Sequence, residues 1–175
     1  MKKNIVKTMY LLVAIITLTV CLSGCGLVRN LGLKNKKAKY AEIHGGWNST
    51  SEDGSYYYFE DDNTYYWYKS SNDLNDNYYK GEMTVLKGQD ALDDLGITED
   101  RLQVVFKNSK GKITENNVYS LHLHPTYLKS GGVDKTNTLT EKFDMKLLFI
   151  YIDENNAQAF NYTMGDTYYL VKKDK

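Results

Sequence analysis

Cysteine is almost absent from this chain of 175 residues. The only two, Cys21 and Cys25, lie close to the amino terminus. Everything after Cys25 therefore lacks a disulfide, a thiol nucleophile and a thiolate metal site. A domain without disulfides must be stable through side-chain packing alone.

The sequence also lacks the short motifs that mark common enzyme sites. It contains no Gly-x-Ser-x-Gly elbow, no glycine-rich phosphate loop and no His-Glu-x-x-His zinc motif. A carboxylate pair for glycoside hydrolysis is defined by a distance in the fold, so an excess of acidic residues does not indicate one. We expect no catalytic activity and no cofactor.

Acidic residues are missing from the start of the chain, and all 22 lie at or beyond Glu42. Eight of the 22 basic residues precede Tyr40, which leaves 14 in the rest of the chain and gives it a net charge of about −8. A domain with this charge repels phosphate backbones, so we expect no nucleic-acid partner.

Long apolar runs are limited to one, Met9–Val20, which follows three lysines and contains no charge. This run is too short for a comfortable transmembrane helix. The small residues Ser23 and Gly24 come after it. A basic start, a short apolar run and a small-residue ending are the layout of a secretory signal, so we expect residues 1–24 to be removed.

The signal ends in Leu22-Ser23-Gly24-Cys25, which resembles the lipobox of bacterial lipoproteins. The resemblance implies cleavage between Gly24 and Cys25 and a diacylglycerol thioether on Cys25, whose two acyl chains give a stable anchor. We therefore expect membrane lipid as a partner and the extracytoplasmic face of the cell membrane as the location. An exported domain without disulfides is more typical of Gram-positive bacteria. The alternative is an uncleaved signal anchor with a chance cysteine.

Residues 25–40 carry basic side chains and no acid. The basic residues are Arg29, Lys34, Lys36, Lys37 and Lys39. A basic charge near an anionic leaflet gains roughly 1 kcal/mol. We interpret this segment as a tether beside the membrane, although an ordinary soluble linker has the same composition. The folded domain is expected at residues 41–175.

From Ile43 onward, short apolar and aromatic segments alternate with turn residues, which is typical of an all-β domain. The expected strands are Ile43–Ser49, Ser55–Glu60, Thr64–Lys69, Asn77–Leu86, Leu102–Lys107, Val118–His124, Phe143–Ile152, Gln158–Met164 and Thr167–Lys172. Both faces of Phe143–Ile152 are apolar, so this strand should be covered on both sides. One short helix is expected at Gln89–Leu95, ended by Gly96.

Short turns between successive strands favour a single antiparallel meander that closes into a barrel, because closure removes free sheet edges. A β-sandwich is the alternative. Gly45-Gly46-Trp47 resembles the Gly-x-Trp pattern of lipocalin-like domains, and Tyr79-Lys80-Gly81-Glu82-Met83 resembles a strand of small lipocalin-like lipoproteins. This resemblance implies a calycin-type barrel with Trp47 closing one end.

Tyrosine is the most unusual part of the composition, with 16 residues. Tyr56–Phe59 and Tyr65–Tyr68 form two aromatic runs on one hairpin, and alternation places aromatic rings on both faces of the sheet. One set can fill the core, and the other set can contact a ligand or partner. The candidate ligand-binding residues are Trp47, Tyr56, Tyr58, Tyr66, Tyr68 and Tyr127. Cross-strand aromatic pairs that only stabilise the sheet explain the same pattern.

His122 and His124 share one strand face and are half of a zinc site, but no third ligand is indicated, so we expect solvated polar residues and no metal. Glu60-Asp61-Asp62-Asn63 lacks the spacing of a calcium loop and is expected to be a hairpin turn. The long segment Pro125–Lys142, with no helical period, is expected to be a lid or an edge cover.

These observations lead to one expected function and one alternative. We expect a non-enzymatic, membrane-anchored lipoprotein that binds a small apolar or carbohydrate-like ligand in or on a tyrosine-rich barrel. The alternative is an interaction module that presents an aromatic sheet face to a protein of the cell envelope. A flat aromatic face on a filled barrel would favour the alternative, and an apolar cavity would favour the ligand.

Overall fold

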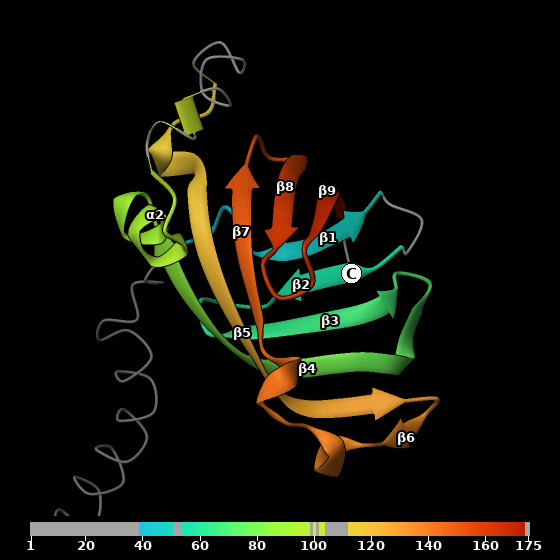
Figure 1. The fold of residues 1–175 in the computed structure, drawn as a ribbon. Helices are drawn as coiled ribbons and strands as arrows, with labels where there is room; N and C mark the ends of the chain where they lie inside the picture. Colours follow the sequence, from blue (N-terminus) through green and yellow to red (C-terminus); the bar gives the residue numbers. More distant parts are fainter. Residues whose placement is uncertain (1–38, 51–53, 99, 101, 104–111, 174–175) are drawn as a thin grey trace, which may run out of the picture. The chain divides into compact units, whose positions relative to one another are not determined.

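A computed structural model of the chain describes residues 39–50, 54–98, 100, 102–103 and 112–173. The expected signal, the expected lipidation site at Cys25 and nearly all of the expected tether lie outside these residues. The folded unit spans residues 38–175. Its main feature is a closed antiparallel β-barrel, so the expected all-β meander barrel is confirmed and the sandwich alternative is not (Figure 1).

Nine strands are described, and eight of them form the barrel. They are β1 (Gly45–Ser49), β2 (Tyr56–Phe59), β3 (Thr64–Ser70), β4 (Asp73–Lys87), β5 (Val118–Ser130), β6 (Val133–Asp134), β7 (Met145–Tyr151), β8 (Asn156–Asn161) and β9 (Asp166–Lys173). Neighbours along the sheet run β4-β3-β2-β1-β9-β8-β7-β5, and pairing of β4 with β5 closes the ring. The short β6 only extends β5 as a hairpin.

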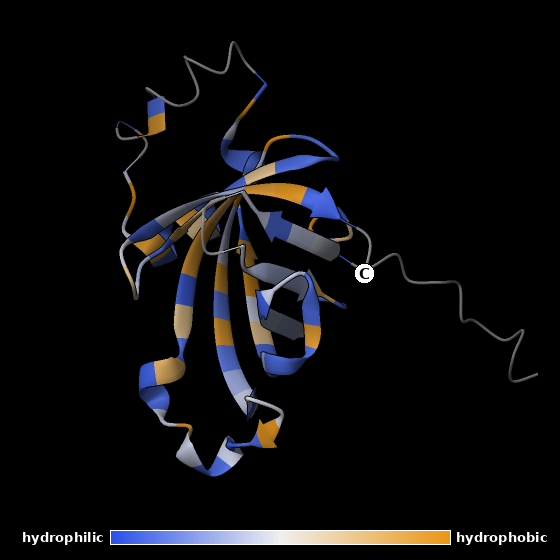
Figure 2. Cartoon of the chain, turned by 90° about the vertical axis from the view of Figure 1, so that its right-hand side faces the viewer, coloured by the Kyte–Doolittle hydropathy of each residue, from blue (hydrophilic) through white to orange (hydrophobic). Residues whose placement is uncertain are grey.

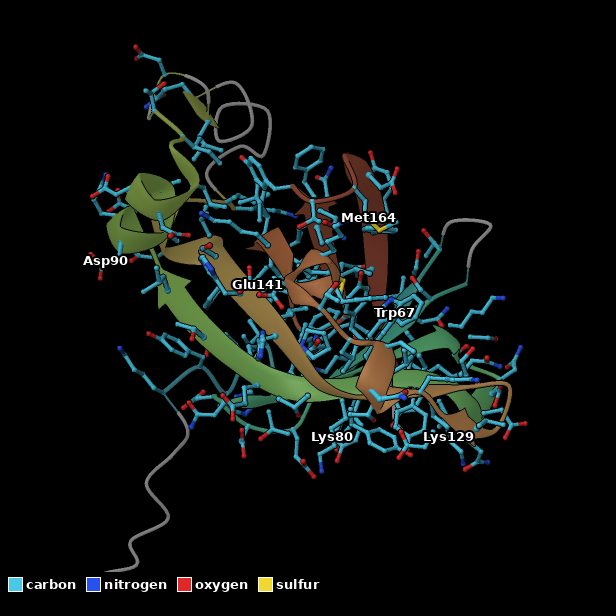
Figure 3. All side chains as sticks on the ribbon, turned by 60° about the horizontal axis from the view of Figure 1, so that its bottom comes forward. Trp67, Lys80, Asp90, Lys129, Glu141 and Met164 are labelled. Carbon is cyan, nitrogen blue, oxygen red and sulfur yellow. The ribbon has the colours of Figure 1, made fainter. Side chains whose placement is uncertain are left out.

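Side chains alternate between the inside and the outside of the barrel along its long strands (Figure 2). In β4, Gly81, Met83 and Val85 are buried, whereas Glu82 and Thr84 between them are exposed. In Figure 3, Trp67 lies on the inner side of the sheet and Lys80 on the outer side. This alternation gives the barrel an apolar interior and a polar exterior.

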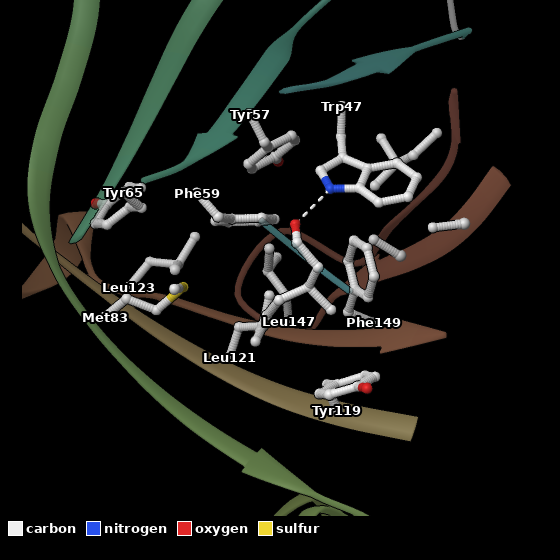
Figure 4. Close-up of a cluster of buried hydrophobic side chains, with 14 of the residues drawn as sticks. Trp47, Tyr57, Phe59, Tyr65, Met83, Tyr119, Leu121, Leu123, Leu147 and Phe149 are labelled. Atoms are coloured by element: carbon white, nitrogen blue, oxygen red, sulfur yellow. Dashed lines mark hydrogen bonds between the residues drawn. The ribbon is translucent and has the colours of Figure 1, made fainter. Parts of the chain in front are cut away.

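The interior is filled by one cluster of buried side chains (Figure 4). Trp47, Phe59 and Phe149 form its aromatic centre, with edge-to-face contacts of 5.4 Å between Trp47 and Phe149 and 6.0 Å between Phe59 and Phe149. Tyr40, expected at the end of the tether, is also buried and packs edge-to-face on Tyr119. The folded domain therefore includes the last residue assigned to the tether.

A second, smaller cluster lies between the barrel and helix α2 (Gln89–Leu95). Ala91 and Leu92 of α2 pack with Val118 of β5 and Leu148 of β7. The helix ends at Gly96, as expected, with a left-handed φ of 63°. Helix α2 lies mainly against β4 and β5, and on β7 only Leu148 reaches this cluster, while Phe149 faces the core. The outer face of β7 is therefore covered in part.

Two expectations about local structure were wrong. Leu102 and Gln103 are helical, so the strand expected at Leu102–Lys107 does not begin there, and residues 104–107 lie outside the described part. The segment Pro125–Lys142 is not a plain loop. Its first six residues continue β5, and β6 and two 3-10 turns, Thr136–Thr138 and Glu141–Phe143, follow. Polar residues near the end of β5 interrupt its apolar pattern, so the sequence did not reveal the full length of this strand.

Candidate functional site

One end of the barrel contains a pocket of about 290 Å³, which we call the mouth pocket. It lies where β8 ends and β7 begins. Its lining residues are Tyr57, Trp67, Tyr79, Lys142, Phe143, Met145, Asn161, Thr163, Met164 and Tyr168. Aromatic and sulfur-containing side chains dominate this lining, which is typical of sites for small apolar ligands.

The aromatic wall of the mouth pocket follows from strand register. Tyr57 pairs with Trp67, and Trp67 pairs with Tyr79, so the three residues form one inward row across β2, β3 and β4. The rings of Trp67 and Tyr79 lie 5.2 Å apart, and Phe143 lies 5.9 Å from Tyr79. The row is thus extended by a residue from the 3-10 turn before β7.

The segment expected to be a lid, Pro125–Lys142, contributes only its last residue to this pocket. Lys142, at the end of the segment, and the adjacent Phe143 line the pocket, and Lys142 is exposed. The turn between β8 and β9 contributes Met164, which is 67% exposed and stands at the rim (Figure 3). The opening is therefore bordered by two short connections.

Six tyrosines from four neighbouring strands form a second aromatic surface, which we call the outer tyrosine face. Its members are Tyr56, Tyr58, Tyr66, Tyr68, Tyr78 and Tyr127. The rings of Tyr66 and Tyr68 are nearly parallel, at 6.0 Å, and Tyr68, Tyr78 and Tyr127 continue the row at spacings of 5.5 and 5.6 Å. Lys80 lies over the ring of Tyr66 at 5.3 Å.

Two members of the outer tyrosine face are buried despite pointing away from the core. Tyr56 is 1% exposed and Tyr68 is 3% exposed. The Tyr56 hydroxyl donates to the carbonyl of Lys173 across β1, and a Cβ on Gly46 would overlap this hydroxyl. Burial raises the pKa of Tyr68 to about 12. The available contact area comes from the half-buried members.

Trp47, expected to close one end of the barrel and to contact ligand, is fully buried. Its indole nitrogen donates to the carbonyl of Ile43 at 2.7 Å (Figure 4). Lys172 lies 4.2 Å from the centre of its ring. It does not line the mouth pocket. The structure thus places Trp47 in the core, while five of the six candidate ligand-binding residues lie together outside the barrel.

The two histidines of β5 bind different aspartates. His122 Nε2 lies 2.8 Å from Asp94 of α2, and His124 Nδ1 lies 2.7 Å from Asp144. Ser120 donates to the same Asp94 oxygen at 2.6 Å, so His122 does not stand between the serine and the carboxylate as a catalytic base would. Among the described residues, no three His, Cys, Asp or Glu side chains are grouped to hold a metal ion.

Asp94 is the most strongly perturbed acid of this region. Desolvation opposes its ionisation, but hydrogen bonds from Ser120, His122 and Lys146 outweigh it and lower the pKa of Asp94 to about 2. Lys146 also donates to the Asp94 carbonyl at 2.7 Å. The four residues therefore attach α2 to β5 and β7, which is a structural role.

The acidic hairpin turn is held by its own backbone. Asp61 accepts hydrogen bonds from the N–H groups of Asn63 and Thr64, and these bonds lower its pKa. Asp62 accepts from the N–H groups of Lys39 and Tyr40 and lies 2.9 Å from His44 Nε2. The expectation of a hairpin turn is confirmed, because this segment joins the antiparallel strands β2 and β3. Both carboxylates accept hydrogen bonds from backbone N–H groups of the fold.

Comparisons of the chain with protein-family models, with curated proteins and with solved structures give no match. No helix in the described part of the chain is long and apolar enough to cross a membrane. The fold and the site therefore define the class. This is an all-β, lipocalin-like meander barrel with one short helix and a small aromatic pocket at its mouth.

Most of the pocket was not predicted as a site. The alternation of the two aromatic runs indicated two faces but not which face points inward. One signal could have decided this: Tyr57 and Trp67 share their face with Phe59, an apolar residue without a polar tip. Asn161 is the last residue of β8, and Thr163 and Met164 lie in the turn after it, whereas the pattern predicted a strand that continues to Met164.

Proposed function

We propose that this protein is a lipid-anchored, extracytoplasmic lipoprotein whose barrel binds a small apolar ligand in the mouth pocket, without catalysis. The observation that supports this most is the pocket itself. It has a wall of aromatic rings and a volume of about 290 Å³, close to the lower limit of ordinary ligand sites. A barrel core that otherwise packs tightly does not need such a space.

The alternative function uses the outer tyrosine face to contact a protein of the cell envelope. Tyr58, Tyr66, Tyr78 and Tyr127 are half-buried there and present ring faces beside Lys80. Tyrosine is enriched at the centres of protein interfaces because it combines apolar area with a hydroxyl group. This face favours a partner rather than an enclosed ligand, because it is not hollowed into any described pocket.

One pair of variants separates the two functions. Phe143→Ala removes a ring from the mouth pocket, and Tyr66→Ala removes a ring from the outer tyrosine face; both side chains are half-buried. The full chain is purified from its own cell type and studied by native mass spectrometry and by pull-down. We expect a co-purifying small molecule in the unchanged chain and in Tyr66→Ala, and a reduced amount in Phe143→Ala.

The opposite pattern supports the alternative. If the unchanged chain carries no small molecule but retains a stable protein partner that is lost in Tyr66→Ala and kept in Phe143→Ala, the ligand proposal is wrong. Circular dichroism of both variants controls for folding.

A further inference from the structure

Asn161 is the one lining residue whose side-chain orientation is fixed by the turn beside it. It is 1% exposed, and its Oδ1 accepts hydrogen bonds from the N–H groups of Thr163 at 2.9 Å and Met164 at 3.1 Å. Both partners are donors, so the oxygen of the amide must face the turn. The amide nitrogen then occupies the other branch of the side chain.

That nitrogen has no hydrogen-bond partner among the described residues, although it is buried. An unpaired buried donor is costly, because it has lost its water and gained nothing in return. Asn161 is one of the residues that line the mouth pocket, and we infer that a molecule packed against it supplies the missing acceptor. Tyr168, another buried lining residue, donates its hydroxyl to Asp166 at 3.4 Å.

Charge in the pocket lining restricts what the acceptor can be. Lys142 is the only charged lining residue in the described part of the chain, and it is exposed at the rim. Tyr57 and Asn161, each 1% exposed, form the buried end. A carboxylate placed there would have no cation to pair with, and burial of an unpaired charge is strongly unfavourable. An uncharged oxygen avoids that cost.

We propose that the mouth pocket takes a small uncharged carbonyl compound, such as a ketone, ester or amide. Its oxygen accepts a hydrogen bond from Asn161 Nδ2, and its apolar body packs against Trp67, Tyr79 and Phe143. This inference rests on the proposed function, because it names the class of ligand that the same pocket binds.

Three probes of similar size isolate the contribution of the oxygen: acetophenone, ethylbenzene and benzoate. They are titrated into the ¹⁵N-labelled full chain, and dissociation constants are measured from shifts in its NMR spectrum. We expect acetophenone to bind about tenfold more tightly than ethylbenzene, the ratio given by one net hydrogen bond. We expect benzoate to bind no better than ethylbenzene, and the side-chain amide signals of Asn161 to shift with acetophenone only.

Asn161→Asp is the matched variant. Its carboxylate keeps the acceptor that holds Thr163 and Met164, and two N–H donors keep it ionised, but it has no hydrogen to donate. The affinity of this variant for acetophenone should fall about tenfold or more, to the level of its affinity for ethylbenzene. Its affinity for ethylbenzene should not change. Asn155→Asp adds the same charge at an exposed loop position outside the pocket and should change neither probe.

The outcomes separate the two proposals. Equal binding of acetophenone and ethylbenzene, unchanged by Asn161→Asp, overturns the carbonyl inference and leaves pocket binding intact; a water retained by Asn161 would give this result. Tightest binding of benzoate overturns it in favour of an anion site at Lys142. If no probe shifts any signal of the pocket, the proposed function fails as well. Should Asn161→Asp not fold, the amide shifts of the unchanged chain decide.

Discussion

Asp94 of helix α2 and His122 of strand β5 are joined by a 2.8 Å hydrogen bond. Ser120 and Lys146 bind the same carboxylate, and these contacts keep the pKa of Asp94 near 2, below its ordinary value of 3.8. The bond is the polar part of the attachment between α2 and the barrel. The apolar part is the cluster around Leu92 and Val118.

This low pKa predicts how stability depends on pH. Because the pKa of Asp94 is lower in the folded than in the unfolded state, its ionised form stabilises the fold fully above about pH 4. That contribution is lost as the pH falls from about 4 through about 2. Asp94→Asn should lower the free energy of unfolding at pH 7 by about 1–2 kcal/mol. Urea unfolding at a series of pH values measures both effects.

The difference between Asp94→Asn and the unchanged chain should shrink as the pH approaches 2. The neighbouring Asp93→Asn is the control, because Asp93 is exposed and an amide oxygen can still accept the bond from Gln89. A constant difference across this range would show that Asp94 is not the titrating group.

Gly81 lies close to the backbone of β5, beside an irregularity in the register of β4 and β5. A Cβ there would overlap the carbonyl of His124 and lie 2.7 Å from the Cα of Pro125, so the backbone would have to move. Gly81→Ala should therefore destabilise the fold by about 2–3 kcal/mol in urea unfolding. A Cβ at Gly165 would meet no neighbour, so Gly165→Ala should destabilise the fold by only about 1–2 kcal/mol. This smaller loss comes from the positive φ of Gly165, which is 81°. Equal destabilisation by the two variants would contradict a close approach of β4 and β5 at Gly81.

The lipobox predicts that Cys25 attaches the chain to the membrane. Cys25→Ala should move the protein from the membrane fraction to the medium or to an unprocessed precursor, because the acyl chains would be missing. Cell fractionation and mass measurement detect both products. Cys21→Ala is the control, since Cys21 lies in the predicted signal, before the predicted cleavage position. Unchanged processing and unchanged extraction into detergent in Cys25→Ala would refute the anchor.

The strand pattern predicted the barrel well, because hairpin turns and alternation are local properties. Helix Gln89–Leu95 was predicted with its bounds, since Gly96 ends it through a left-handed conformation that the residue type itself favours. The extension of β5 through Pro125–Ser130 was missed. Those residues pair with residues 78–81 of β4, and a partner so distant in sequence leaves no mark in a local window.

The candidate site was predicted only in part. The two aromatic runs were recognised, but the six chosen residues are Trp47 in the core and five tyrosines outside the barrel, whereas Tyr57 and Trp67 line the mouth pocket. A shift of one position moves every side chain to the other face, so the choice depends on register. Asn161 could not be found from sequence, because its free amide group exists only through the turn that follows it.

Within the ring, β1 pairs with β9, so the first and the last of the described strands are neighbours. Trp47 lies opposite Lys172, and Lys172 also holds the carbonyl of His44. A chain that emerges from its amino terminus can build the hairpins of β2, β3 and β4 early, since their partners are close in sequence. The ring itself cannot close before β9 has been synthesised. Removal of β9 would leave two open sheet edges, one along β1 and one along β8.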